Sequence, residues 1–180
     1  MIITSGDAIY KMDYNKVLEY HIAKKADITV VCKDLNDGED ARRFGTLKLN
    51  ENMRVEEFEE KPMMAKSRTV STGIYIIRRR QLIDLIEQCA EDDRYDFVSD
   101  ILIRYKNLKK IYAYKIKDYW SNISTVDAYY QTNMDFLKAD VRKHFFKTYP
   151  AIYSKVGDLP PAKIQSGCSC KEQVWLPAEV

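Results

Sequence analysis

The chain has 180 residues, of which 46% are hydrophobic and 12% aromatic, a composition that excludes a disordered protein and allows one domain, or a domain with an appendage, around a buried core. Lys and Arg (29) nearly balance Asp and Glu (27), and the basic residues are scattered, so the net charge of +2 does not favour a nucleic acid as partner. No stretch approaches the roughly 20 apolar residues of a membrane span, so we expect no membrane partner.

The four cysteines predict neither a disulfide framework nor a zinc site. Cys32 lies in an apolar run and Cys89 at helical spacing from apolar residues, so we interpret both as small buried hydrophobic side chains. Cys168 and Cys170 form a C-x-C pair without a second pair of ligands. This usage fits a reducing, cytoplasmic setting, and no signal peptide precedes the first predicted strand.

The chain opens on an apolar run, Met1–Ile3, which predicts a buried strand that ends in a turn of small residues before Asp7. Ligands of open α/β sheets collect at the carboxyl ends of strands, so Asp7 is a candidate for holding a metal ion or a hydroxyl group. The alternative interpretation is a turn aspartate that bonds its own backbone. Because the sequence starts inside a strand, we expect that material normally preceding it is missing.

A helix and a second strand follow this turn. Asp13 is placed to cap a helix, and we interpret His21 as a packed, hydrogen-bonded histidine on its apolar stripe. The residues of this stripe are Tyr14, Val17, Leu18, His21 and Ile22. Residues 27–33 are β-branched and apolar, which favours a buried strand. Together with residues 1–3 these elements predict a right-handed parallel unit.

The middle of the chain predicts a hairpin and a further strand. Residues 44–58 alternate around the turn Asn50–Asn52, and residues 69–77 form an apolar run with Gly73 inside it, where a ligand or another backbone approaches closely. Strands that alternate with helices, with a hairpin inserted, indicate an α/β sandwich around a largely parallel sheet. The later elements are predicted as a helix over 81–90, a helix capped by Asp96, a strand over 110–117, a helix capped by Ser124 or Thr125 that runs to about 138, and a helix over 141–149.

Polar residues stand at the ends of three later apolar runs, in residues 58–62 (F-E-E-K-P), 70–75 (V-S-T-G-I-Y) and 119–125 (Y-W-S-N-I-S-T). Several such loops in one chain suggest one site shared with Asp7. For Lys61, taken alone, the alternative is a surface lysine paired with a neighbouring glutamate, which contributes little stability.

Four segments in this order, S-G-D-A-I-Y-K-M-D-Y, F-E-E-K-P, S-T-G-I-Y and Y-W-S-N-I-S-T, resemble sugar-1-phosphate nucleotidyltransferases, and most closely the glucose-1-phosphate adenylyltransferase family. The resemblance covers residues 2–164. Within the family, the chain is similar to the GlgD-type subunit, which accompanies a catalytic subunit in a hetero-oligomer of bacterial glycogen synthesis.

This resemblance implies a Rossmann-like nucleotidyltransferase sandwich of the glycosyltransferase A kind. Residues 1–149 would form its latter part, without the N-terminal nucleotide-binding part, and residues 150–180 a connector and the truncated start of a left-handed β-helix. The implied substrates are glucose 1-phosphate and ATP, which form ADP-glucose and pyrophosphate. Because the family's Gly-rich nucleotide loop has no counterpart here, we expect ATP to bind only with the missing part.

The resemblance also implies roles for individual residues. Asp7 matches the first of two aspartates that hold Mg²⁺, a hard cation that needs anionic oxygen ligands. Lys61 matches the lysine that binds the phosphate of glucose 1-phosphate. The positions that contact the sugar or lie near it are matched by Gly45, Glu60, Ser71 and Gly73.

Three departures from the family pattern argue against efficient catalysis. Asn122 stands where the second metal aspartate is expected, and its neutral amide brings no charge to Mg²⁺. Ser124 replaces a glycine, and Ala8 stands where a histidine is usual.

Three functions therefore remain open for this chain. The first is a regulatory or weakly catalytic subunit that keeps the sugar-phosphate pocket. The second is an active nucleotidyltransferase in which substrate phosphates and water complete the Mg²⁺ shell despite Asn122. The third is a non-functional fragment whose exposed sheet edge makes it an assembly or aggregation module.

Overall fold

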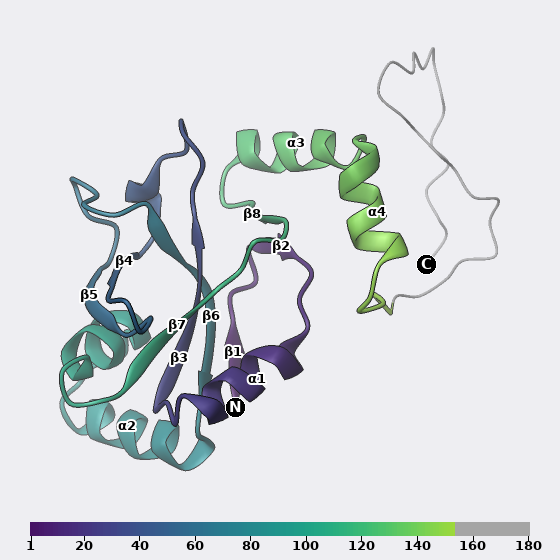
Figure 1. Ribbon diagram of the computed structural model, residues 1–180. Helices are drawn as coiled ribbons and strands as arrows, with labels where there is room; N and C mark the ends of the chain where they lie inside the picture. Colours follow the sequence, from purple (N-terminus) through teal and green to yellow (C-terminus); the bar gives the residue numbers. More distant parts are fainter. Residues whose placement is uncertain (154–180) are drawn as a thin grey trace, which may run out of the picture. The chain divides into compact units, whose positions relative to one another are not determined.

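The computed structural model describes residues 1–153, which fall into two compact units, Met1–Trp120 and a second unit that begins at Ser121 (Figure 1). The predicted connector and β-helix start, residues 150–180, lie almost wholly outside the described residues and are not tested. None of the helices within residues 1–153 is long and apolar enough to cross a membrane.

The first unit is an α/β structure on a mixed six-stranded sheet. Five strands follow the order β5-β4-β6-β3-β7, and β1 pairs with β6 beside this path. Strands β3 and β7 run parallel, while β6 runs antiparallel to β1, β3 and β4. The strands are β1 (Ile2–Thr4), β3 (Ile28–Asp34), β4 (Thr46–Leu49), β5 (Val55–Glu59), β6 (Thr69–Ile77) and β7 (Ile111–Lys115).

The prediction of a largely parallel sheet is therefore wrong. Strands β1 and β3 point the same way, as the predicted strand, helix and strand unit requires, but β6 lies antiparallel between them. Residue periodicity identifies strands without giving their direction, which depends on the connections. Here β6 follows a hairpin, and its long apolar run suits a central strand that is buried on both faces.

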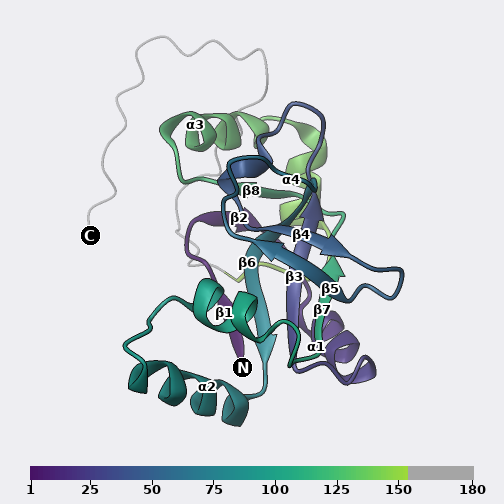
Figure 2. The ribbon, with the colours of Figure 1, turned by 90° about the vertical axis from the view of Figure 1, so that its left-hand side faces the viewer.

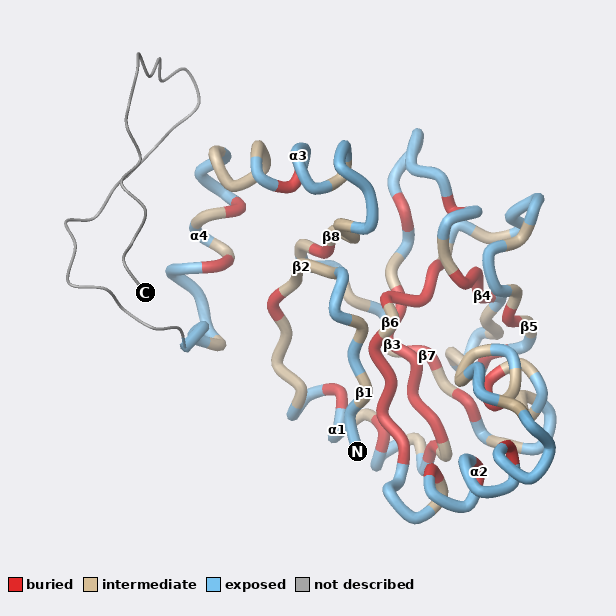
Figure 3. The backbone as a smooth tube through the Cα atoms, turned by 180° about the vertical axis from the view of Figure 1, so that it is seen from behind, coloured by how far each residue is buried: buried red, intermediate tan, exposed pale blue. Residues whose placement is uncertain are grey.

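Burial separates the central strands from β1. Most residues of β3 and β6 are buried, and they form the core of the first unit (Figure 3). The prediction that the first strand is buried is wrong, since Ile2 is 43% exposed. The reason is its place in the sheet: within the part of the chain that the structure describes, β1 pairs with β6 along one edge and with no strand along the other.

Strands β4 and β5 form the predicted hairpin, and β4 pairs with β6 (Figure 2). The Asn50 side chain accepts the main-chain N–H groups of Asn52 and Arg54, which closes the turn. The turn is also tied to β7, because Ala113 N–H donates to the Met53 carbonyl oxygen at 2.8 Å. The hairpin is thus bonded to other strands at its turn as well as along β6.

Helix α1 spans Tyr14–Ala23 and is capped as predicted by Asp13, whose carboxylate accepts the N–H of Asn15. Its buried stripe is narrower than the sequence indicates, because Val17 is buried while Ile22 is 64% exposed. The other helical segments of this unit are η1 (Ala41–Arg43), α2 (Arg79–Glu91) and η2 (Phe97–Ile103), a wide π-type helix capped by Asp96.

Two short strands and two further helices complete the described chain: β2 (Ala8–Tyr10), β8 (Trp120–Asn122), α3 (Val126–Asp135) and α4 (Ala139–Lys147). Thr125 caps α3 as predicted, but α3 ends at Asp135 rather than at 138. In the second unit, Phe136 packs against Phe145 with ring centroids 4.8 Å apart, so that α4 packs back on the end of α3.

The end of α1 gives a test of backbone conformation. Lys24 has an ordinary helical φ of −75°, whereas Lys25 has a left-handed φ of 48° that favours glycine. Lys25→Gly should raise the free energy of unfolding by about 1 kcal/mol, measured by urea unfolding. Lys24→Gly is the matched control and should lower it, because Lys24 also donates to the Asn52 carbonyl. A loss of stability in Lys25→Gly would contradict this assignment.

His21 confirms the prediction of a packed, hydrogen-bonded histidine. The side chain is buried, and Nδ1 lies 2.8 Å from the Thr29 hydroxyl oxygen. Burial lowers the pKa of His21, and the positive charge of Arg78 lowers it further, against a smaller opposing effect of Asp27. The folded state therefore favours the neutral imidazole.

This lowered pKa predicts a pH dependence of stability. Between the folded pKa and the unfolded value of about 6.5, the unfolded chain binds more protons, so the free energy of unfolding falls as the pH falls through this window. Urea unfolding between pH 7.5 and 5.5 should show this decline, and His21→Gln should flatten it. An equally steep decline in the variant would assign the effect to another group.

Candidate active site

Four of the predicted site residues meet where the β4–β5 hairpin joins β6. Ser71 and Gly73 lie on β6, Gly45 directly precedes β4, and Glu60 directly follows β5. The Ser71 N–H donates to the Gly45 carbonyl oxygen at 2.8 Å, which holds the two segments together. The structure thus brings together residues that lie up to 28 positions apart.

A bulge in β6 shapes this place. Val31 and Cys32 are consecutive on β3, but their partners on β6 are Ile74 and Ser71, so Thr72 and Gly73 are extra residues. Gly73 has φ of +75°, a left-handed conformation that a side chain would strain. The bulge turns Ser71 and Tyr75 toward one another, with their hydroxyl oxygens 3.1 Å apart.

Glu60 lies against the bare main chain of Gly45. A Cβ atom on Gly45 would lie 2.8 Å from Glu60 Oε2 and 2.8 Å from the ring of Phe58. Only a glycine at this position leaves room for the carboxylate. The Glu60 side chain is 33% exposed, and burial raises its pKa against the opposing charge of Lys61, with Asp96 adding to the increase.

Lys61 presents its amino group beside this carboxylate. The Nζ atom lies 4.0 Å from Glu60 Oε1, and the side chain is 69% exposed. An exposed pair at this distance contributes little stability, so the amino group stays available to an incoming anion. Lys61 has a left-handed φ of 42°, an uncommon conformation for a residue with a side chain, and such strain gathers at functional sites.

The bulge also touches the turn that carries Asp7. The Ser5 N–H donates to the Gly73 carbonyl oxygen at 2.9 Å, and a Cβ atom on Gly73 would lie 2.9 Å from the Ser5 hydroxyl oxygen. Asp7 follows two residues later and is exposed. Of the two neighbours predicted for Gly73, a ligand or another backbone, the structure shows another chain segment, since Ser5 packs on it and links β6 to the Asp7 turn.

Asn122 is the last residue of β8 and lies in the second unit. Its amide oxygen accepts the main-chain N–H of Ser124 at 3.1 Å and also the Ser124 hydroxyl. An amide oxygen already shared by two donors makes a poor ligand for a hard cation. Among residues 1–153, no three or more His, Cys, Asp or Glu side chains gather where they could hold a metal ion. The joint Mg²⁺ site of Asp7 and Asn122 remains a prediction.

Sequence reasoning missed Tyr75, Asp96 and Phe97. Tyr75 is buried, and its ring centroid lies 5.1 Å from that of Phe97. Burial raises the pKa of Tyr75 against the opposing hydrogen bond with Ser71, and the charges of Glu60 and Asp96 add smaller increases. Tyr75 ends the S-T-G-I-Y segment, so its place four residues after Ser71 could have drawn attention to it. Asp96 and Phe97 come from a different element, and no local sequence pattern indicates that they lie near Tyr75.

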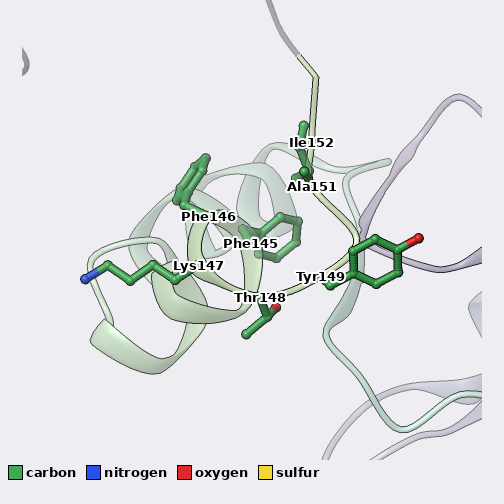
Figure 4. Close-up of a pocket in the computed structure, with 7 residues that line it drawn as sticks. All are labelled: Phe145, Phe146, Lys147, Thr148, Tyr149, Ala151 and Ile152. Atoms are coloured by element: carbon green, nitrogen blue, oxygen red, sulfur yellow. The ribbon is translucent and has the colours of Figure 1, made fainter.

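A hollow of about 380 Å³ lies in the second unit at the end of α4 (Figure 4). None of the predicted site residues lines it. Its lining residues are Phe145, Phe146, Lys147, Thr148, Tyr149, Ala151 and Ile152.

Gly45 gives a test of this geometry before any ligand is considered. Gly45→Ala should push the Glu60 carboxylate outward, because the Phe58 ring on the other side is buried in the core. We expect a loss of about 1–3 kcal/mol in the free energy of unfolding and a fall of the Glu60 pKa toward its ordinary value, followed by carbon NMR titration.

Gly6→Ala is the matched control for Gly45→Ala. A Cβ atom on Gly6 would meet nothing within 4 Å, so this variant should stay within about 0.5 kcal/mol of the parent. An unchanged Glu60 pKa in Gly45→Ala would contradict the packing of the carboxylate on Gly45.

Comparison with known proteins places these residues in context. A family model described as nucleotidyl transferase matches residues 1–139. Glucose-1-phosphate adenylyltransferase of Bacillus subtilis (strain 168) is 38% identical over 177 residues, which cover 97% of this chain and 46% of that protein. The enzyme of the same name from Mycoplasma mobile is 38% identical over 169 residues, 92% of this chain and 44% of that protein.

A less similar relative matches over a comparable length of the chain. Glucose-1-phosphate adenylyltransferase of Thermosipho melanesiensis is 32% identical over 176 residues, 97% of this chain and 42% of that protein. The chain spans about half the length of the curated relatives it matches.

Proposed function

This chain belongs to the nucleotidyl transferase family, and we propose on that premise that it forms the sugar-phosphate-binding part of a glucose-1-phosphate adenylyltransferase. The observation that carries the proposal is the meeting of Gly45, Glu60 and Ser71 beside the exposed amino group of Lys61. The names of the relatives support the choice of substrate. Glucose 1-phosphate is the ligand we assign to this site.

Each side chain then has a chemical task. The Lys61 ammonium group donates to the phosphate of glucose 1-phosphate, a charge-assisted contact that is stronger than a neutral hydrogen bond. The Glu60 carboxylate accepts from sugar hydroxyls, and the hydroxyls of Ser71 and Tyr75 offer further partners close to it. Adjacent residues would thus recognise the two parts of the ligand, Glu60 the sugar and Lys61 the phosphate. The left-handed backbone at Lys61 sets the direction in which its side chain leaves the main chain.

We further propose a regulatory or weakly catalytic role of the GlgD type. In the complete reaction, an oxygen of the sugar phosphate attacks the α-phosphate of ATP and pyrophosphate leaves. Mg²⁺, when bound, would neutralise charge that builds on the transferred group. Asp7 would supply one anionic ligand, but the Asn122 oxygen is neutral and engaged by Ser124, which argues for slow turnover.

The partners follow from the same proposal. ATP would bind together with the nucleotide-binding part that the relatives' greater length accommodates, and a catalytic subunit would complete the hetero-oligomer. Glycogen synthesis in the cytoplasm is the setting that the GlgD resemblance implies. The activity of the whole protein is a proposal that depends on these partners.

Calorimetric titration of glucose 1-phosphate into the 180-residue chain tests the site. We expect Lys61→Ala to weaken binding by roughly 10- to 100-fold, the value of one charge-assisted contact of about 1.5–3 kcal/mol. Alanine needs the same left-handed backbone as lysine at this position, so the change removes mainly the charge. Binding should be the same with and without Mg²⁺, since the proposed sugar-phosphate contacts do not include Asp7 or Asn122.

Lys66→Ala is the matched control for the Lys61 titration. Lys66 lies five residues on, is 72% exposed and pairs with Glu59, so its loss removes the same charge from the same surface. It should change the affinity less than twofold. Equal losses of affinity in the two variants would show that Lys61 acts only through general charge attraction. If the parent chain does not bind glucose 1-phosphate, the proposed sugar-phosphate site is wrong.

A further inference from the structure

A cavity of about 280 Å³ opens between the end of α2 and the start of η2. Cys89 and Ile101 form buried parts of its wall, while Ile86 and Tyr95 are largely exposed and stand at its rim. The remaining lining residues are Ala90, Arg94, Asp96 and Phe97. Two of these, Asp96 and Phe97, also belong to the surroundings of Tyr75 and Glu60.

The connection after α2 keeps this cavity in place. The N–H groups of Asp92 and Arg94 both donate to the Cys89 carbonyl oxygen, at 3.1 and 2.9 Å, so the chain turns back sharply at the end of the helix. Asp93 takes a left-handed φ of 54° in this turn. Asp96 then caps η2 through the N–H of Ser99 at 2.6 Å. Main-chain bonds thus fix one wall, and a bond from a main-chain N–H to the Asp96 side chain fixes the other.

The charged residues of the cavity wall already have polar partners. Two of its described lining residues, Arg94 and Asp96, are charged. The Arg94 guanidinium lies 3.8 Å from the Asp92 carboxylate, and the Asp96 carboxylate accepts from η2. Burial raises the pKa of the Cys89 thiol, which keeps it neutral. Because Arg94 already faces a carboxylate and the buried part of the wall is formed by Cys89 and Ile101, the lining favours a neutral, apolar ligand.

We propose that this cavity binds a compact neutral aromatic molecule of about the size of indole, and that its occupancy changes the contact between Phe97 and Tyr75. A cavity of about 150 Å³ already holds benzene, so about 280 Å³ has room for two fused rings. The aromatic rings of Tyr95 and Phe97 offer edge and face contacts to such a ligand.

The path from the cavity to the candidate site is short. Phe97 lines the cavity, its ring centroid lies 5.1 Å from that of Tyr75, and the Tyr75 hydroxyl lies 3.1 Å from the Ser71 hydroxyl oxygen. A ligand that shifts Phe97 therefore changes the wall against which the sugar-phosphate site is built. By linkage, such a ligand and glucose 1-phosphate change each other's affinity by the same factor. This last step alone rests on the proposed function.

The test uses indole as the probe, with the 180-residue chain labelled at its tyrosine rings for NMR. We expect indole to bind saturably and to shift the Tyr75 ring signal, which Tyr75→Phe identifies. Ala90→Phe, which fills the cavity from α2, should weaken indole binding at least tenfold. Asp84→Phe places the same ring on an exposed position of the same helix and should leave it unchanged.

Each outcome decides one part of the proposal. Failure of indole to bind, or equal binding in Ala90→Phe and the parent, would overturn the cavity as a ligand site. Saturable binding without a shift of Tyr75 would overturn the coupling. If indole binds and shifts Tyr75 while glucose 1-phosphate does not bind, the cavity and its contact stand and the proposed sugar-phosphate function fails.

Discussion

The bulge at Thr72 and Gly73 is the constraint on which the candidate site depends. Two extra residues on β6, opposite a single step of β3, break the alternation of the strand in the middle of the sheet. The Thr72 hydroxyl donates to the Val31 carbonyl oxygen at 3.0 Å, so the irregular segment remains bonded to β3. Because Gly73 takes the left-handed backbone, Ser71 and Tyr75 meet, and the Asp7 turn comes against β6.

The site is assembled from segments that have little structure of their own. Gly45 and Glu60 lie outside the regular strands of the hairpin, and Lys61 begins the connection to β6. What fixes them is packing on buried neighbours, above all the Phe58 ring and the main chain of Ser71. A rigid sheet thus positions residues from loops, which is the usual division of labour between scaffold and function.

The sequence predicted the parts of this structure that depend on neighbouring residues. The Asp13, Asp96 and Thr125 caps, the hairpin and the packed His21 all follow from local hydrogen bonding or hydrophobic spacing. Strand direction and the exposure of β1 did not follow, since both depend on which strand lies alongside. The resemblance identified Gly45, Glu60, Ser71 and Gly73, but Asp96 and Phe97 reach Tyr75 only through tertiary packing.

The two-ended attachment of the hairpin has a consequence for ligand recognition. At one end, Gly45 is bonded to Ser71, and at the other end Met53 is bonded to Ala113 while Lys24 holds Asn52. A hairpin attached at one end swings freely and must be immobilised by each ligand at a cost in entropy. In this chain the hairpin is already fixed when the protein folds, so Glu60 is preorganised for its ligand. Less of the free energy of each ligand contact is then lost to ordering the hairpin, which raises the affinity.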